Sequence, residues 1–245
     1  LLLSFKTDGL ITVSDTSRKS IEKQFRFLPG KIWKISPGVD CERFNPTVDG
    51  SKVRSRYAVD KDTPLVGIVA RVQPHRRFDI FLKAIKILVA EIPRLKVFII
   101  GRGTHIQEVA IKPAHEMGLS ECICFTGYQL HGYPETLAAL DLKVFLVPGS
   151  DGSCRAVREA MAMGKPVVAA NRGMLPEIVD DGVNGFVVED TPENLAGAIS
   201  LLIKDKELRH KMGEAARKKM NEESNLIHQQ AKIEEFYRHI LNSQL

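Results

Sequence analysis

The stretch from Phe145 to Asn171 constrains the fold more strongly than any other part of the sequence. A short apolar run, Val144–Val147, is typical of a buried parallel strand, and a Pro-Gly-Ser turn interrupts it. An alanine-rich helix is predicted over Ser153–Met163, with Gly164 as its C-terminal stop, and Pro166–Ala170 is predicted to be the next strand. This order of strand, turn and helix is typical of doubly wound α/β proteins.

Two acidic residues bracket the start of this helix, Asp151 in the turn and Glu159 within the helix. The first amides of a helix have no partners inside it, so the turn is suited to bind an anion. The two acids are too far apart in sequence to bind one ligand atom, but they can hold two ends of one long ligand. A nucleotide sugar, with phosphates between two sets of hydroxyls, fits this pattern. A turn with only a structural role, in which Asp151 acts as an N-cap, is the alternative.

From Leu65 onward, predicted strands and helices alternate with short loops. This alternation predicts a Rossmann-like, doubly wound parallel sheet with helices on both faces, whose ligands bind at the carboxyl ends of the strands. The predicted strands are Gly9–Ser14, Lys31–Ser36, Leu65–Ala70, Leu95–Ile100, Cys122–Thr126, Val144–Val147, Pro166–Ala170 and Phe186–Val188. The predicted helices are Ser14–Phe27, Lys52–Tyr57, Phe78–Val89, a helix ending near Met117, Pro134–Ala139, Ser153–Met163, Leu175–Val179, Pro192–Ile203, Lys206–Met220 and Asn225–Leu241.

Composition narrows the class of protein. With 44% hydrophobic and 27% charged residues, the chain has the composition of a soluble globular protein, and no apolar run is long enough to span a bilayer. The net charge of +5 is modest, and no basic patch interleaved with aromatics points to nucleic acid. The basic cluster between Lys204 and Lys219 indicates a solvated helix face, with weak attraction to anionic lipid as the alternative. The four cysteines have no zinc-binding spacing and are expected to be reduced thiols.

Two arginines and a glycine pair follow predicted strands. Gly101 and Gly103 come directly after Leu95–Ile100, but the third glycine of a dinucleotide fingerprint is missing, so the signal for NAD is weak. Arg71 and Arg76 follow Leu65–Ala70 and are expected to face the same crevice as Asp151. Two guanidiniums there suit a diphosphate whose negative charge grows as its bond to a sugar breaks.

Taken together, these motifs resemble the C-terminal half of glycosyltransferase family 4, whose members are retaining enzymes with the glycosyltransferase-B fold. The resemblance covers nearly the whole chain, including an interdomain linker at Val39-Asp40-x-x-x-Phe44-x-Pro46. The motifs that carry it are, in order, Arg71 and Arg76, Gly101-x-Gly103, Phe125-Thr126-Gly127, Asp151-x7-Glu159-Ala-Met-Ala-x-Gly164, Pro176-Glu177 and Asn184-Gly185.

The resemblance implies a role for each matching residue. Asp151 would contact the donor sugar and, with Arg71 and Arg76 on the diphosphate, is a candidate catalytic residue. Glu159 would bind the ribose hydroxyls. The other candidates for donor binding are Gly152, Ser153 and Cys154 at the sugar or phosphate, and Gly103, Thr126, Gly127 and Tyr128 along the nucleoside.

Several positions depart from the family pattern, and we interpret them as marks of a subfamily. Asp151 is one methylene shorter than the usual Glu, and Arg76 replaces the usual Lys. Arg77 stands where the family has Gly, and Ser153-Cys154 replaces a Phe-Gly pair. Cys154 is expected to be a small residue in a tight space, with an unusually acidic thiol as the alternative.

The resemblance also divides the chain. Residues 1–46 are expected to be the tail end of an N-terminal domain with the interdomain linker, since one strand-helix-strand unit is too small for a domain and no initiator Met is present. Residues 47–222 are expected to form the nucleotide-sugar donor-binding domain. Residues 223–245 are expected to form a C-terminal helix that packs back on the N-terminal domain.

The function implied by the resemblance is transfer of a hexose or similar sugar from a nucleotide-diphosphate sugar, with retention of configuration. No metal site and no cofactor are expected, because the nucleotide sugar is a substrate. The acceptor, a glycan or a lipid-linked molecule, would bind the N-terminal domain, in the cytoplasm or at the inner face of the membrane. We therefore expect this chain alone to bind donor but to transfer nothing. The alternatives are an inactive nucleotide-sugar binding module, an epimerase of the same fold and, more distantly, a NAD oxidoreductase.

Overall fold

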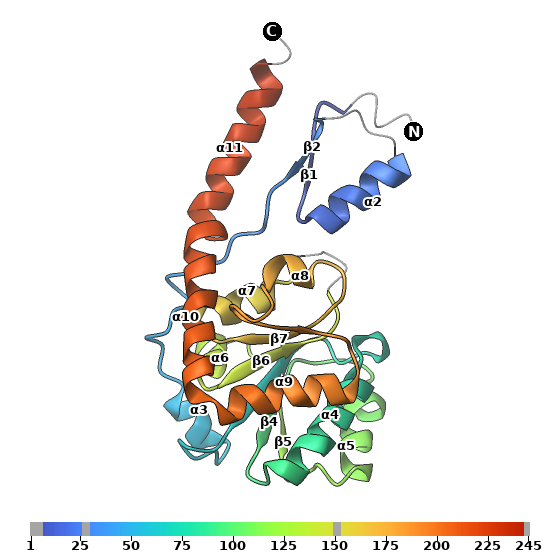
Figure 1. The fold of residues 1–245 in the computed structure, drawn as a ribbon, viewed down its shortest axis with the longest axis vertical. Coiled ribbons are helices and arrows are strands. Elements are labelled where there is room, and N and C mark those ends of the chain that lie inside the picture. The colour runs from blue at the N-terminus through green and yellow to red at the C-terminus, as the bar shows by residue number, and fades with distance from the viewer. Residues whose placement is uncertain (1–6, 26–29, 149–152, 243–245) are drawn as a thin grey trace.

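The computed structural model describes residues 7–25, 30–148 and 153–242, and its main feature is a six-stranded, all-parallel sheet in the order β5-β4-β3-β6-β7-β8 (Figure 1). From β3 the chain passes outward through β4 and β5, then crosses to β6 and continues through β7 and β8. The strand order therefore reverses between β3 and β6, which is where doubly wound sheets bind ligands. The strands are β3 (Leu65–Val69), β4 (Lys96–Ile100), β5 (Ile123–Gly127), β6 (Leu142–Phe145), β7 (Val167–Ala170) and β8 (Gly185–Val188).

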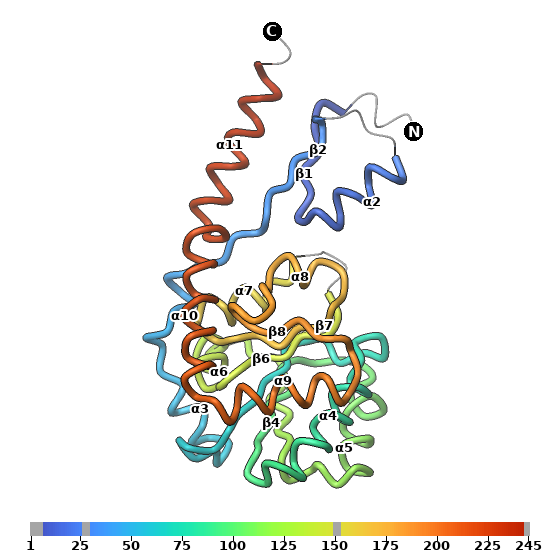
Figure 2. Tube along the Cα trace, in the orientation of Figure 1, coloured from blue at the N-terminus to red at the C-terminus, as the bar shows by residue number. Residues whose placement is uncertain are grey.

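Helices cover both faces of this sheet, and each face has its own apolar core. α4 and α9 pack together on one face, while α6 and α7 contribute to the core on the other (Figure 2). The predicted α/β fold, a Rossmann-like parallel sheet between two helical layers, is confirmed. The helices of this part are α3 (Ser51–Arg56), η1 (Pro74–Arg76), α4 (Phe78–Glu91), η2 (Gln107–Ile111), α5 (Lys112–Glu116), α6 (Tyr133–Ala138), α7 (Arg155–Ala162), α8 (Leu175–Ile178), α9 (Pro192–Lys204) and α10 (Lys206–Glu223).

The N-terminal segment forms a separate two-stranded parallel sheet from β1 (Leu10–Thr12) and β2 (Ile32–Lys34), joined by α2 (Asp15–Phe25). A carboxylate from the main part of the chain caps α2, because Glu177 accepts hydrogen bonds from the amides of Asp15 at 2.7 Å and Thr16 at 2.8 Å. The last helix, α11 (Leu226–Asn242), runs beside β1 and β2 (Figure 1), and its Phe236 ring packs edge-to-face on Trp33, 5.7 Å between centroids.

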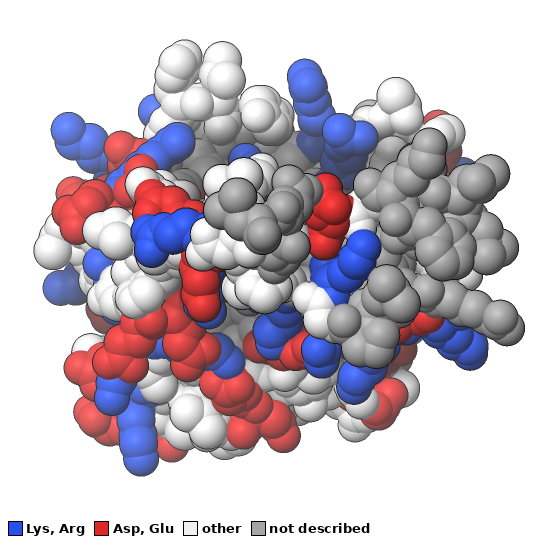
Figure 3. Space-filling view, turned by 90° about the horizontal axis from the view of Figure 1, so that it is seen from above, with Lys and Arg blue, Asp and Glu red and all other residues white. Residues whose placement is uncertain are grey.

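Surface charge is mixed on the face seen from above in Figure 3, where basic and acidic side chains are interspersed. Within the ranges that the structure describes, no helix combines the length and the apolar character needed to cross a membrane.

Candidate functional site

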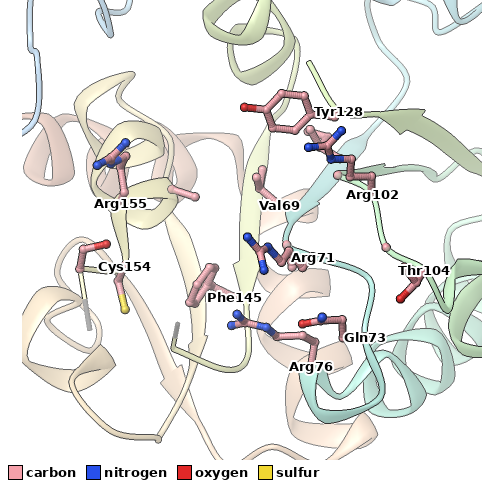
Figure 4. Close-up of a pocket in the computed structure, with 16 residues that line it drawn as sticks. Val69, Arg71, Gln73, Arg76, Arg102, Thr104, Tyr128, Phe145, Cys154 and Arg155 are labelled. Atoms are coloured by element: carbon pink, nitrogen blue, oxygen red, sulfur yellow. The ribbon is translucent and has the colours of Figure 1, made fainter. Parts of the chain in front are cut away.

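A cavity of about 750 Å³ opens at the carboxyl ends of β3, β4 and β6, where the strand order reverses (Figure 4). It has two walls from different parts of the chain. What we call the loop wall consists of Val69, Ala70, Arg71, Gln73, Arg76, Ile100, Gly101, Arg102, Gly103, Thr104 and Tyr128. What we call the helix wall consists of Phe145, Ser153, Cys154, Arg155 and Ala156.

Close contact between two loops builds the loop wall. The Val72 amide donates a hydrogen bond to the carbonyl of Arg102 at 3.1 Å, so the loop after β3 lies against the loop after β4. A Cβ atom on Gly101 would lie 2.0 Å from the carbonyl oxygen of Ala70, and one on Gly103 would lie 1.9 Å from that of Val72. Only glycine allows such an approach. The glycine pair that gave a weak signal for NAD therefore has a packing role, which places Arg102 on the cavity.

Arg71 and Arg76 both point from the loop wall towards Phe145 (Figure 4). Arg71 is exposed and makes no hydrogen bond or ion pair with any residue that the structure describes. Arg76 is fixed, because its Nη1 donates to the carbonyls of Val147 at 2.8 Å and Pro148 at 3.1 Å, while its buried Nε has no partner among the described residues. The two arginines predicted to converge do line one cavity.

Arg102 and Tyr128 form the outer part of the loop wall. The Arg102 guanidinium lies 4.9 Å from the centroid of the Tyr128 ring (Figure 4), and that ring is 62% exposed. An exposed aromatic ring at the mouth of a cavity can stack on a flat ligand such as a nucleobase.

The helix wall presents the start of α7. Cys154 is its N-cap and is buried, and its carbonyl accepts hydrogen bonds from the amides of Val157 at 2.9 Å and Arg158 at 3.3 Å, so the first two amides of α7, those of Arg155 and Ala156, precede the ladder of the helix. Arg155 is exposed and forms no ion pair with a described residue. Ser153 and Cys154 line the cavity, and the phosphate or sugar contacts expected of these residues stay predictions.

Three predicted site residues lie behind the walls. Glu159 is 8% exposed and accepts a hydrogen bond from the hydroxyl of Tyr133 at 3.0 Å. Burial, together with the nearby charge of Glu159, raises the pKa of Tyr133 well above its usual value. Thr126 is buried, and the carbonyl of Gly127 accepts a hydrogen bond from the amide of Gly101 at 2.9 Å. Asp151 and Gly152 lie outside the described residues, and the contacts predicted for them stay predictions.

Two departures from the family pattern share a backbone feature. Arg77 has a φ of 60° and Cys154 a φ of 44°, and both are in the left-handed region that favours glycine. The glycines that the resemblance leads us to expect at these positions would suit this left-handed geometry. Arg77 keeps the left-handed geometry and adds an ion pair with Asp190 at 2.9 Å.

Sequence reasoning missed several residues of the site, including Arg102, Arg155 and Phe145. The sequence does contain a signal for Lys143, which lies behind the helix wall, because a lysine interrupts an otherwise apolar run there.

The cavity is strongly basic. Four arginines line it, and among its described lining residues there is no aspartate or glutamate. The described residues also contain no cluster of three or more His, Cys, Asp or Glu arranged to hold a metal ion. Such a site is suited to an anionic ligand with more than one charged group.

The comparison with family models decides the family. The model described as glycosyl transferases group 1 matches residues 50–219, which include both walls of the cavity. This chain belongs to that family.

Two relatives of this chain are also glycosyltransferases. The chain is 30% identical over 221 residues to a D-inositol 3-phosphate glycosyltransferase from Corynebacterium jeikeium, covering 85% of this chain and 52% of the relative. It is 32% identical over 194 residues to a GDP-mannose-dependent alpha-(1-6)-phosphatidylinositol monomannoside mannosyltransferase from Mycolicibacterium smegmatis, covering 75% and 50%. The chain thus spans about half the length of the relatives it matches.

Solved structures support the fold. The crystal structure of Alr3699/HepE from Anabaena, in complex with UDP and glucose, superposes with a TM-score of 0.84 at 24% identity, covering 94% of this chain and 63% of that one. At this level of identity the likeness concerns the fold alone.

Proposed function

We propose that this glycosyl transferases group 1 chain is the donor-binding half of a retaining glycosyltransferase of family 4. It would hold a nucleotide-diphosphate sugar in the cavity between the loop wall and the helix wall. The observation that carries the proposal is the placement of four arginines around one cavity at the reversal of strand order, with no carboxylate among the described lining residues.

We propose a distinct task for each of these residues. The diphosphate would lie between Arg71 and Arg76, and the fixed guanidinium of Arg76 is ordered in advance by two backbone carbonyls. The first amides of α7, those of Arg155 and Ala156, would bind the same phosphates. The base would lie along Gly103 and Tyr128. When the bond between the anomeric carbon and the diphosphate breaks, negative charge grows on the leaving group, where the arginines stabilise it.

The remaining roles follow the family. Asp151 would contact the sugar, Glu159 would approach the ribose after a local rearrangement of its bond with Tyr133, and the acceptor would attack from the face that the diphosphate leaves. We propose a glycan or lipid-linked acceptor, bound through an N-terminal domain, and action in the cytoplasm or at the inner face of the membrane. The nucleotide sugar is the substrate, and no cofactor is proposed.

A calorimetric titration of this chain with UDP-, GDP- and ADP-sugars tests the proposal. We expect saturable binding of one donor class and at least a tenfold weaker affinity in Arg76→Ala, because charge-assisted hydrogen bonds contribute about 1.5–3 kcal/mol each. Glu159→Ala should weaken binding if the carboxylate reaches the ribose. Binding should also raise the melting temperature, by an amount that grows with the logarithm of ligand concentration above the Kd.

A matched control is Arg94→Ala, which removes an exposed arginine before β4, at the amino edge of the sheet. This variant should bind like the wild type, and NAD should not bind either protein. If no donor class binds the folded chain, the proposed donor-binding role is wrong. Donor binding without transfer by a full-length protein would favour the inactive binding module.

A further inference from the structure

Lys143 is a buried lysine directly behind the helix wall. It lies in β6, between Gly67 of β3 and Val167 of β7, and its side chain is 0% exposed. The Nζ atom donates a hydrogen bond to the carbonyl of Ala156 in the first turn of α7. It also lies 5.5 Å from the centroid of the Phe145 ring. Ala156 and Phe145 both line the cavity, so this amine contacts two residues of the proposed diphosphate site from behind.

The titratable groups around Lys143 are few. α7 contributes Glu159 and, at its N-cap, Cys154, while Tyr133 of α6 is hydrogen-bonded to Glu159. The flanking residues of β3 and β7 carry no charge. Burial lowers the pKa of Lys143 to about 7, although electrostatic interactions with Glu159 and Cys154 act to raise it. None of the described carboxylates forms an ion pair with this amine within 4.0 Å.

Burying an amine without an ion-pair partner destabilises a protein, and a central strand would accommodate an apolar side chain more easily. A perturbed ionisable group beside a cavity indicates a functional role more often than one elsewhere. A ligand in the cavity can supply the negative charge that Lys143 lacks as a partner, because charges interact strongly across an interior of low dielectric constant. The two charges of a diphosphate would lie on the other side of Phe145 and Ala156.

We propose that Lys143 is a positioning residue for the donor diphosphate, and that donor binding is coupled to the uptake of one proton by its Nζ atom. In the empty site the amine is partly neutral at neutral pH. The negative charge of the bound diphosphate favours protonation of the amine. The resulting ammonium group then stabilises both the phosphates and, through its hydrogen bond to Ala156, the first turn of α7. This inference rests on the proposed donor-binding function and adds to it a pH dependence that arginines cannot supply, because they stay charged.

Calorimetry in two buffers of different ionisation enthalpy measures this uptake. Titrations with UDP-glucose and GDP-mannose suit the purpose, because neither diphosphate diester titrates near neutral pH. A lysine with a pKa of about 7 is charged in roughly one molecule in ten at pH 8. We therefore expect roughly 0.5–0.9 proton taken up per donor bound at pH 8, and an affinity that falls roughly 10- to 100-fold from pH 6.5 to pH 9.

Two variants separate this role from a purely structural one. Lys143→Met removes the charge and should abolish proton uptake and flatten the pH dependence of affinity. Lys165→Met is the matched control, because Lys165 is also largely buried, donates to a backbone carbonyl, that of Ala138 at 2.8 Å, and has a pKa lowered to about 8. It precedes β7, so it lies at the amino edge of the sheet, away from the cavity, and its variant should keep the wild-type uptake.

The outcomes are distinct. Donor binding by the wild type with no proton uptake at pH 8 would overturn the role of Lys143 and leave the donor site intact, even if Lys143→Met failed to fold. Uptake that persists in Lys143→Met would also overturn it. Absence of binding by any donor class would overturn the proposed function and this inference with it.

Discussion

The two walls of the cavity carry positive charge in different ways. On the loop wall, three arginines face the cavity directly, and close-packed glycine loops hold their backbone in place. On the helix wall, Arg155 is exposed, and the second cationic side chain, Lys143, is buried directly behind the wall and donates a hydrogen bond to the carbonyl of Ala156. The loop wall is therefore charged at every physiological pH, whereas part of the charge of the helix wall depends on pH.

This difference means that one cavity combines a positive charge that is constant with pH and a positive charge that changes with pH. Guanidiniums provide a constant field for phosphates, and their positions depend on backbone contacts that tolerate no side chain. A buried amine provides charge only when its surroundings favour the protonated form. We therefore expect the loop wall to respond most to substitutions that add a side chain at its glycines. We expect the helix wall to respond most to changes in the protonation of Lys143.

The largest effect is expected at the loop contact, with Gly103→Ala. The new Cβ would lie 1.9 Å from the backbone oxygen of Val72, so one loop must move away from the other. We expect a loss of about 2–4 kcal/mol in the free energy of unfolding, measured by urea denaturation, together with weaker donor binding.

Gly197→Ala is the control for this change. Gly197 lies in α9 with open space around its Cβ position, so alanine there should stabilise the chain by about 0.5–1 kcal/mol. A stability of Gly103→Ala equal to the wild type would mean that the loops adapt easily, and the contrast between the two walls would weaken.

An intermediate effect of opposite sign is expected on the helix wall, with Lys143→Met. The pKa of Lys143 is lowered from 10.5 to about 7 on folding, so between these values the unfolded chain binds more protons. The stability of the wild type should thus rise with pH from about 7 to about 10.5. The variant avoids burial of the charge and should be more stable by about 1–4 kcal/mol near pH 7, with a gain that shrinks towards pH 10.

Urea denaturation of both proteins at several pH values between 6 and 10 measures this gain. A variant that is less stable than the wild type at pH 7 would show that the bond to Ala156 outweighs the burial of the amine.

The smallest effect is expected at Cys154, where the backbone is left-handed. Cys154→Gly relieves the strain of a positive φ but loses a buried side chain, whereas Cys154→Ala keeps the strain. We expect the glycine variant to be more stable than the alanine variant by about 1 kcal/mol, the reverse of the order expected at Gly197. Thermal unfolding of the pair checks this order, and an alanine variant of equal or greater stability would show that the position tolerates side chains without strain.

The sequence by itself determined the class of fold and one side of the site. Apolar runs such as Leu65–Ala70 and the helical spacing of Phe78, Phe81 and Leu82 are local patterns, so strands and helices could be predicted within a few residues of their ends. The position of Arg71 and Arg76 directly after a strand was enough to place them at the carboxyl edge of the sheet.

Only the tertiary structure decided which residues share the cavity. Gly101 and Gly103 acquire their role from Ala70 and Val72, about thirty residues away in sequence, and no local pattern reports that contact. From the sequence, Glu159 and Asp151 are predicted to hold two ends of one ligand. In the structure, the packing of α7 on the sheet buries Glu159, which accepts a hydrogen bond from Tyr133. The charge of Lys143 is visible in the sequence, but its meaning depends on burial between β3 and β7, because the dielectric surroundings of an amine, and hence its protonation, are a property of the folded chain.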